Sequence, residues 1–175
     1  MRETILMKKN SGFTLMEVMV TIGIVAIMSA IAIPSYISWL PKHRMSGATR
    51  DIYSAMQYAR MRAVKEKTTV EINFSAGAED YTVFIDDGRG GGTANNNIAD
   101  GTETIKTGQM PVDVDLFNAA FGAGSRTNFD SRGIPSPFGN VELRNVPRQL
   151  YRRVVLRISG HPVIRTSSDG GATWQ

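Results

Sequence analysis

Apolar residues fill one long stretch near the start of the chain, from Phe13 to Ile33, and Glu17 is its only charged residue. As an α-helix, residues 13–33 would be about 31 Å long, which is close to the hydrocarbon thickness of a bilayer. Two aromatic residues of the kind found at membrane interfaces follow, Tyr36 and Trp39. The pattern predicts a membrane-spanning helix.

Two prolines, Pro34 and Pro41, stand at the end of this stretch and lack a backbone donor, so we expect each to bend or interrupt the helix. A carboxylate such as Glu17 costs about 2.5–3.5 kcal/mol inside an apolar span, so it calls for a partner. A secretory signal peptide gives no reason for the glutamate, and its apolar core has only about 7–15 residues. Alternatively, Glu17 contacts lipid headgroups near the interface.

Beyond Pro41 the pattern becomes amphipathic. Apolar residues recur at three- and four-residue spacing, and most basic residues lie off that line. The stripe consists of Met45, Ala48, Ile52, Ala55, Ala59 and Ala63. These residues predict a helix that lies along a sheet, rather than an exposed helix with incidental alanines.

After Lys67 the apolar period becomes two, which is typical of strands. We expect a hairpin from Thr68–Phe74 and Tyr81–Ile85, a polar, flexible surface loop over 86–104, and a second hairpin near the end of the chain. The remaining short strands are expected at Thr104–Lys106, Val112–Leu116, Thr127–Phe129 and Val141–Arg144. In the last hairpin, Val154, Leu156 and Ile158 should face one side and Arg153, Val155 and Arg157 the other, before Val163–Thr166. The Gly- and Ser-rich tail Ser167–Gln175 is expected to be loose, although Trp174 can dock on this domain.

The segment Lys8-Lys9-Asn10-Ser11-Gly12-Phe13-Thr14-Leu15-Met16-Glu17 resembles the class III signal of type IV pilins and type II secretion pseudopilins. The resemblance implies that prepilin peptidase cuts between Gly12 and Phe13 and that the new amine of Phe13 is methylated. It also makes Glu17 the fifth residue of the mature chain and Pro34 the position of a helix kink.

The order of a long helix followed by strands, with the turn Phe129-Asp130-Ser131-Arg132-Gly133, resembles the GspH/FimT-like branch of these proteins. The fold class expected is α+β and pilin-like, a long N-terminal helix packed on a predominantly antiparallel sheet. The expected domains are a leader (1–12), a transmembrane and fibre-core stem (13–41) and a periplasmic globular domain (42–175).

Glu17 fits a physical role in such a fibre. Cleavage creates a cationic amine at Phe13, and this amine can meet the Glu17 carboxylate of a neighbouring subunit in a low-dielectric environment. Because an unpaired buried charge is costly, the pair would favour one assembly register.

The net charge of +4 is unevenly distributed, with +5 over residues 42–67, −6 over 68–140 and +4 over 141–175. Such segregation can guide subunit contacts or attract a polyanion, although charged faces are usually only solvated. The run Gly88–Gly92 lacks the lysine of a P-loop, and the acidic residues of 86–103 do not have EF-hand spacing. With two histidines and no cysteine, we expect no enzyme, metal or cofactor.

The C-terminal cations are all arginines, which suit phosphate contacts, and Arg153 and Arg157 should share a strand face. FimT-like pilins are linked to DNA capture through a Gly-Arg-x-Arg type of motif. The corresponding turn here, Gly160-His161-Pro162-Val163-Ile164-Arg165, matches clearly only at Arg165. DNA binding in DNA uptake is therefore an alternative, with a solvated or subunit-contacting face as the plainer interpretation.

Together these features predict a minor pilin or pseudopilin of the inner membrane that works by assembly, with a priming or tip role. Lys8 and Lys9 place the N-terminus in the cytoplasm and the bulk of the chain in the periplasm. The expected partners are prepilin peptidase and other pilins or pseudopilins. A type IV pilus and a type II secretion system use the same leader and stem, so the sequence predicts both machines equally.

Overall fold

The computed structural model describes residues 12–94 and 96–175. Most of the expected leader, including Lys8–Ser11, lies outside the described residues. The chain forms two units, one up to Trp39 and one from Leu40 to Gln175. The only α-helix in the described part of the chain, α1 (Leu15–Glu66), contributes residues to both.

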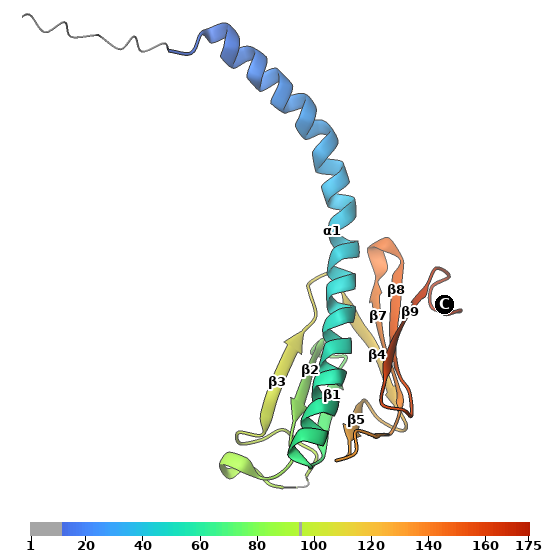
Figure 1. The fold of residues 1–175 in the computed structure, drawn as a ribbon. Helices are drawn as coiled ribbons and strands as arrows, with labels where there is room; N and C mark the ends of the chain where they lie inside the picture. The colour runs from blue at the N-terminus through green and yellow to red at the C-terminus, as the bar shows by residue number, and fades with distance from the viewer. Residues whose placement is uncertain (1–11, 95) are drawn as a thin grey trace, which may run out of the picture. The chain divides into compact units, whose positions relative to one another are not determined.

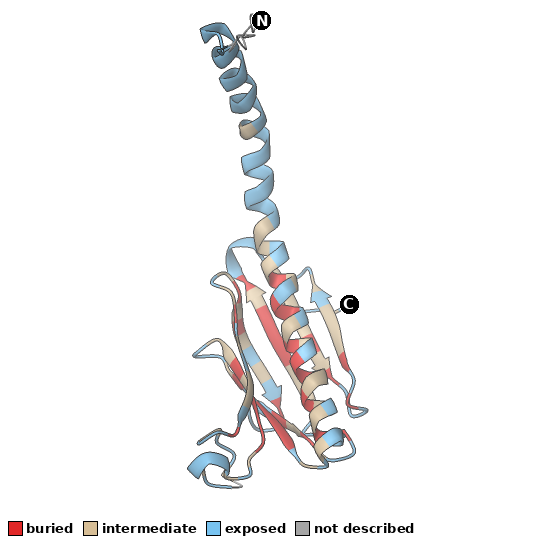
Figure 2. Ribbon diagram, turned by 60° about the vertical axis from the view of Figure 1, so that its left-hand side comes forward, coloured by how far each residue is buried: buried red, intermediate tan, exposed pale blue. Residues whose placement is uncertain are grey.

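Within the globular unit, the second half of α1 lies across the strands (Figure 1). Figure 2 shows its buried positions on the side that faces the sheets. The buried residues are Met45, Ala48, Thr49, Ile52, Ala55, Met56, Ala59 and Ala63. All six positions of the predicted stripe are buried, so that prediction is confirmed. Its alanines carry little side chain, which lets the helix approach the strands closely.

The first sheet has five antiparallel strands in the order β3-β2-β1-β5-β6. Its strands are β1 (Val70–Ser75), β2 (Asp80–Phe84), β3 (Thr104–Gln109), β5 (Arg126–Phe129) and β6 (Pro135–Ser136). The predicted first hairpin is confirmed, because β1 pairs with β2 from Glu71 opposite Phe84 to Ser75 opposite Asp80. The following loop, which contains a 3-10 turn (Arg89–Gly91), returns the chain to β3.

The second sheet has four antiparallel strands in the order β4-β7-β8-β9. Its strands are β4 (Asp115–Phe121), β7 (Gly139–Asn145), β8 (Leu150–Leu156) and β9 (Pro162–Ser167), with a 3-10 turn (Val146–Arg148) between β7 and β8. The predicted C-terminal hairpin is thereby confirmed. Inward residues of both sheets share one core with α1, where the Phe74 and Phe121 rings stack with centroids 5.5 Å apart.

Two strand predictions are wrong in their bounds. The strand expected at Val112–Leu116 begins only at Asp115, because Pro111 opens a turn in which its carbonyl accepts a hydrogen bond from Val114 N at 2.8 Å. Strand β8 ends at Leu156, so Arg157 and Ile158 lie beyond it, and Ile158 is exposed rather than packed beside Leu156.

Candidate assembly site

Helix α1 begins next to the expected cleavage point. Thr14 precedes its first residue and acts as its cap: the Thr14 side-chain oxygen accepts a hydrogen bond from Glu17 N at 3.2 Å. This oxygen satisfies one of the amides that a helix start leaves without a partner. The cap was not among the predictions, although Thr14-Leu15-Met16-Glu17 has the spacing of a capping box. Glu17 therefore lies in the first helical turn.

From residue 12 onward, the N-terminal unit presents an apolar surface. Phe13 is 81% exposed, and the large apolar side chains from Leu15 to Ile33 are exposed as well. By length and composition, helix α1 could cross a membrane, and its most apolar segment of 18 residues contains no buried residue. Glu17 is exposed on the same helix.

The prolines do not interrupt α1. Helical residues continue without a break through Pro34 and Pro41 to Glu66. The alternative of an interruption is wrong, and the bend at Pro34 stays a prediction.

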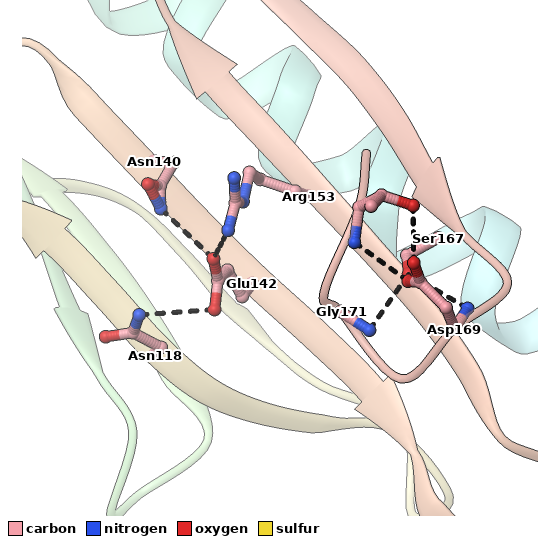
Figure 3. A network of polar contacts seen from close by, with 8 residues as sticks. Asn118, Asn140, Glu142, Arg153, Ser167, Asp169 and Gly171 are labelled. Atoms are coloured by element: carbon pink, nitrogen blue, oxygen red, sulfur yellow. Dashed lines mark hydrogen bonds and ion pairs between the residues drawn. The ribbon is translucent and has the colours of Figure 1, made fainter. Parts of the chain in front are cut away.

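In the globular unit, an arginine network lies on the face of the second sheet turned away from α1. Glu142 on β7 accepts hydrogen bonds from Asn118 at 3.2 Å and Asn140 at 3.5 Å, and it forms an ion pair with Arg153 on β8 (Figure 3). Glu142 is only 7% exposed. The network satisfies a nearly buried carboxylate, so it stabilises the sheet.

Trp174 covers this network, so the expectation of a loose tail is wrong and the docking of Trp174 is confirmed. The guanidinium carbon of Arg153 lies 4.0 Å from the Trp174 ring centroid, and Thr166 and Gln175 exchange two backbone hydrogen bonds of 3.0 Å. The tail is thereby fixed along β9. The charge of Arg153 is therefore paired with the Glu142 carboxylate, and the plane of its guanidinium lies over the Trp174 ring.

The three arginines considered for DNA binding are placed differently. Arg153 and Arg165 are opposite each other on β8 and β9, but Arg165 donates to the Trp174 carbonyl at 3.4 Å. Arg157 lies past the end of β8 and is not part of a strand. The expectation that Arg153 and Arg157 share a strand face is therefore wrong. The structure brings two of the three together and gives both contacts within the protein.

The loop between β2 and β3 uses its carboxylates to bind its own backbone. Glu103, 1% exposed, accepts from Gly88 N at 2.5 Å and Asp100 N at 3.2 Å, and Asp100 accepts from Thr93 N at 3.1 Å. The loop is polar as predicted, but these bonds close it into a folded segment. The carboxylates of Glu103 and Asp100 are thus used within the loop itself.

The turn Phe129–Gly133, quoted from the sequence, is a docking point for α1. Asp130 accepts hydrogen bonds from Ile134 N and Arg132 N, both at 2.9 Å, and these bonds together with the Arg132 guanidinium lower the pKa of Asp130. Gly133 has φ +75°, and its carbonyl accepts from Arg60 Nε at 3.1 Å. The turn therefore needs a glycine at 133.

Residues 48–160 match the sequence model of the family described as Type II transport protein GspH. The chain belongs to the GspH family. Residues 7–33 match the prokaryotic N-terminal methylation motif, which includes Gly12, Phe13 and Glu17. The two matches place the chain among the type IV pilins and pseudopilins, whose members are structural subunits, and the pilin-like α+β fold expected from the sequence is confirmed.

Two curated relatives match the chain over short stretches. Prepilin peptidase-dependent protein D of Escherichia coli is 61% identical over 36 residues, 21% of this chain and 25% of the relative. A fimbrial protein of Pseudomonas aeruginosa is 37% identical over 60 residues, 34% of this chain and 38% of the relative. The GspH-family chain thus spans well under half of either relative.

The crystal structure of the type IV minor pilin FimU of Pseudomonas aeruginosa shares the fold. It superposes with a TM-score of 0.52 at 13% sequence identity and covers 77% of this chain and 94% of FimU. The likeness supports the fold of the GspH-family chain.

Proposed function

We propose that this chain is a minor pilin or pseudopilin subunit that prepilin peptidase cuts between Gly12 and Phe13 and methylates at Phe13. Residues 13–41 then serve as membrane anchor and fibre core, and 42–175 as the periplasmic domain. The subunit joins a type IV pilus or a type II secretion pseudopilus, where it acts in priming or at the tip. The Escherichia coli relative, whose name states prepilin peptidase dependence, supports the processing step.

The observation that carries this proposal is the uncovered apolar helix that begins at the methylation motif. Its large side chains are exposed along the whole described N-terminal unit, and burying them is favourable by about 25 cal/mol per Å². A membrane or the stems of neighbouring subunits can supply that burial. Because Glu17 lies in the first turn of the same helix, a neighbour's Phe13 amine is the partner that we propose for it.

Processing is tested by intact-mass measurement of the chain expressed with and without prepilin peptidase. We expect loss of residues 1–12 and one added methyl group only when the peptidase is active. An uncut chain in a strain with active peptidase would overturn the assignment.

Assembly is tested with Glu17→Ala, compared with Glu66→Ala, which removes a partly buried ion pair with Arg62 in the globular unit instead. Glu17→Ala should be cut normally but largely lost from sheared fibres, because the Phe13 amine then lacks its partner. Glu66→Ala should enter fibres as the wild type does. Normal incorporation of Glu17→Ala would refute the pairing of Glu17 with a neighbour's Phe13 amine. Subunits cross-linked to this chain in the fibre would show whether it belongs to a type IV pilus or to a type II secretion pseudopilus.

DNA uptake remains the alternative function, and the contacts of Arg153 and Arg165 do not favour it. A salt series of gel shifts with the purified chain tests it, because phosphate contacts weaken steeply with salt. We expect no shift at low salt. A shift that Arg157→Gln and Arg165→Gln weaken would instead establish the DNA receptor.

A further inference from the structure

At one end of the globular unit, a cavity of about 170 Å³ opens between α1 and the β8–β9 hairpin. Two cationic side chains, Lys42 from α1 and Arg152 from β8, line it together with several hydroxyl-bearing residues. The lining residues are Lys42, Met45, Leu150, Tyr151, Arg152, Thr166 and Ser167. We call this cavity the Lys42–Arg152 pocket.

Arg152 has no ion pair and no side-chain hydrogen bond among the described residues, although its side chain is half-buried. Its burial, together with the nearby positive charge of Arg50, lowers the pKa of Arg152. The acid nearest to the lining in sequence is Asp169, whose carboxylate accepts hydrogen bonds from Ser167 and Thr173. The pocket therefore concentrates positive charge with no carboxylate in its lining, which suits an anion.

A groove beside the pocket exposes apolar loop residues. Pro41, which precedes Lys42, lines this groove, so both hollows lie at the same end of the globular unit. The other lining residues are Val112, Asp113, Asp115, Asn145, Val146, Pro147 and Arg148. The two carboxylates are already neutralised, because Asp113 pairs with Arg44 and Asp115 pairs with Arg144. Val112 is 95% exposed and Val146 is 54% exposed, and each lies in a loop between strands. Exposed apolar loop tips beside cations are typical of surfaces that contact lipid.

The sequence position of this end agrees with a membrane surface. Lys42 follows Trp39 by three residues, and Trp39 closes the apolar stretch that we propose as the membrane anchor. A ligand held here would need a negative group for Lys42 and Arg152 and apolar chains for the valines.

We propose that the Lys42–Arg152 pocket binds the phosphate of an anionic phospholipid headgroup while Val112 and Val146 contact the lipid interface. The site would hold the globular domain on the membrane before assembly. This inference rests on the proposed anchoring by residues 13–41.

The test is lipid binding to the full chain in a non-ionic detergent, followed by native mass spectrometry. Dioctanoylphosphatidylglycerol is titrated against dioctanoylphosphatidylcholine and against inorganic phosphate. The variant Lys42→Gln/Arg152→Gln is compared with Lys65→Gln/Arg157→Gln, which removes the same two charge types outside the pocket. We expect the wild type to prefer phosphatidylglycerol and the pocket variant to lose about fivefold in affinity for each charge removed. The control variant should change by less than twofold.

Each other outcome contradicts the proposal. Equal binding of the two lipids, or equal losses in both variants, would show that no headgroup site exists. Displacement of phosphatidylglycerol by inorganic phosphate at the same concentration would indicate a free-phosphate site instead. If circular dichroism shows that the double variant is misfolded, the lipid affinity of Lys42→Gln alone tests the proposal. Lys42 is exposed, so this substitution leaves the core intact. A chain that stays monodisperse without detergent would refute the anchoring itself, which separates the two failures.

Discussion

The two units of this chain use apolar residues in opposite ways. In the globular unit, large apolar side chains from both sheets are buried against α1, and Tyr81, Phe74 and Phe121 are at most 1% exposed. In the N-terminal unit, the large apolar side chains of the same helix remain exposed. The globular unit buries its own apolar side chains, whereas the described residues of the N-terminal unit leave theirs exposed.

The polar groups show the same contrast. Glu142 in the globular unit is surrounded by two asparagines and an arginine of its own chain. Glu17 in the N-terminal unit uses its backbone for the Thr14 cap and is exposed. A carboxylate with no side-chain partner among residues 12–94 and 96–175, on an apolar helix, fits a contact made only after assembly, which is why we propose the assembly register there.

The largest expected difference in unfolding free energy comes from an isoleucine-to-alanine change made at two positions of α1, one in each unit. Ile52→Ala in the globular unit should lower the free energy of unfolding by about 2–5 kcal/mol, because Ile52 is 0% exposed and leaves a cavity. Ile24→Ala, whose side chain is 53% exposed, should leave this free energy unchanged. Urea denaturation of the full chain in detergent, followed by far-UV circular dichroism, measures both. Equal losses would contradict the division into two units.

A smaller effect is expected from the Glu142 network. Glu142→Ala should cost about 2 kcal/mol in unfolding free energy, since it removes a nearly buried carboxylate that accepts from two asparagines as well as from Arg153. Glu66→Ala removes the ion pair with Arg62 within α1 and should cost no more than about 0.5 kcal/mol. The same denaturation curves compare the two variants. A cost for Glu142→Ala no larger than that of Glu66→Ala would show that the network does not support the sheet.

Glycine positions allow a third test. Gly133→Ala should cost about 1–2 kcal/mol, because φ is +75° and the new Cβ would lie 3.1 Å from the Arg60 side chain. Gly124→Ala meets no atom within 4 Å and has no positive φ, so it serves as the matched control. Thermal unfolding of both variants measures the difference. An unchanged midpoint for Gly133→Ala would mean that the turn does not depend on this glycine to dock on α1.

The sequence predicted the elements whose patterns are local. The three- and four-residue stripe from Met45 to Ala63 identified the buried face of α1, and the alternation in Val70–Phe74 identified β1. The start of β4 was missed because Val112 belongs to a turn opened by Pro111. The division into two sheets was also beyond local patterns, since it depends on pairings between distant strands.

The candidate site divides in the same way. Gly12, Phe13 and Glu17 were found because the methylation motif is contiguous. The Lys42–Arg152 pocket was not, because its two cations are 110 positions apart and meet only through the packing of β8 on α1. The Glu142–Arg153 pair was equally hidden, since it depends on the register between β7 and β8.

Glu71 provides the smallest and most specific test. Glu71 alternates along β1 with the core residues Val70 and Ile72, yet it is itself only 8% exposed, in a cavity that Thr68, Thr69, Asp86 and Asn97 also line. Burial raises the pKa of Glu71, the positive charge of Arg126 opposes this rise, and the negative charge of Asp86 adds to it. Between the unfolded and folded pKa values, the folded chain binds a proton that the unfolded chain has released, so stability falls as pH increases through that window.

Glu71→Gln removes this titration, so the variant should gain stability over the wild type at neutral pH and lose that gain below a pH of about 4. Arg126→Gln is the opposing variant: it removes the charge that favours ionised Glu71, so it should steepen the fall in stability with rising pH. Urea denaturation of the full chain at a series of pH values measures both slopes. The prediction fails if the free energy of unfolding of the wild type rises with pH in this window and neither variant changes that slope. The Glu71 carboxylate would then be as well solvated as one on an open strand face, and the loop after β2 would not cover the sheet.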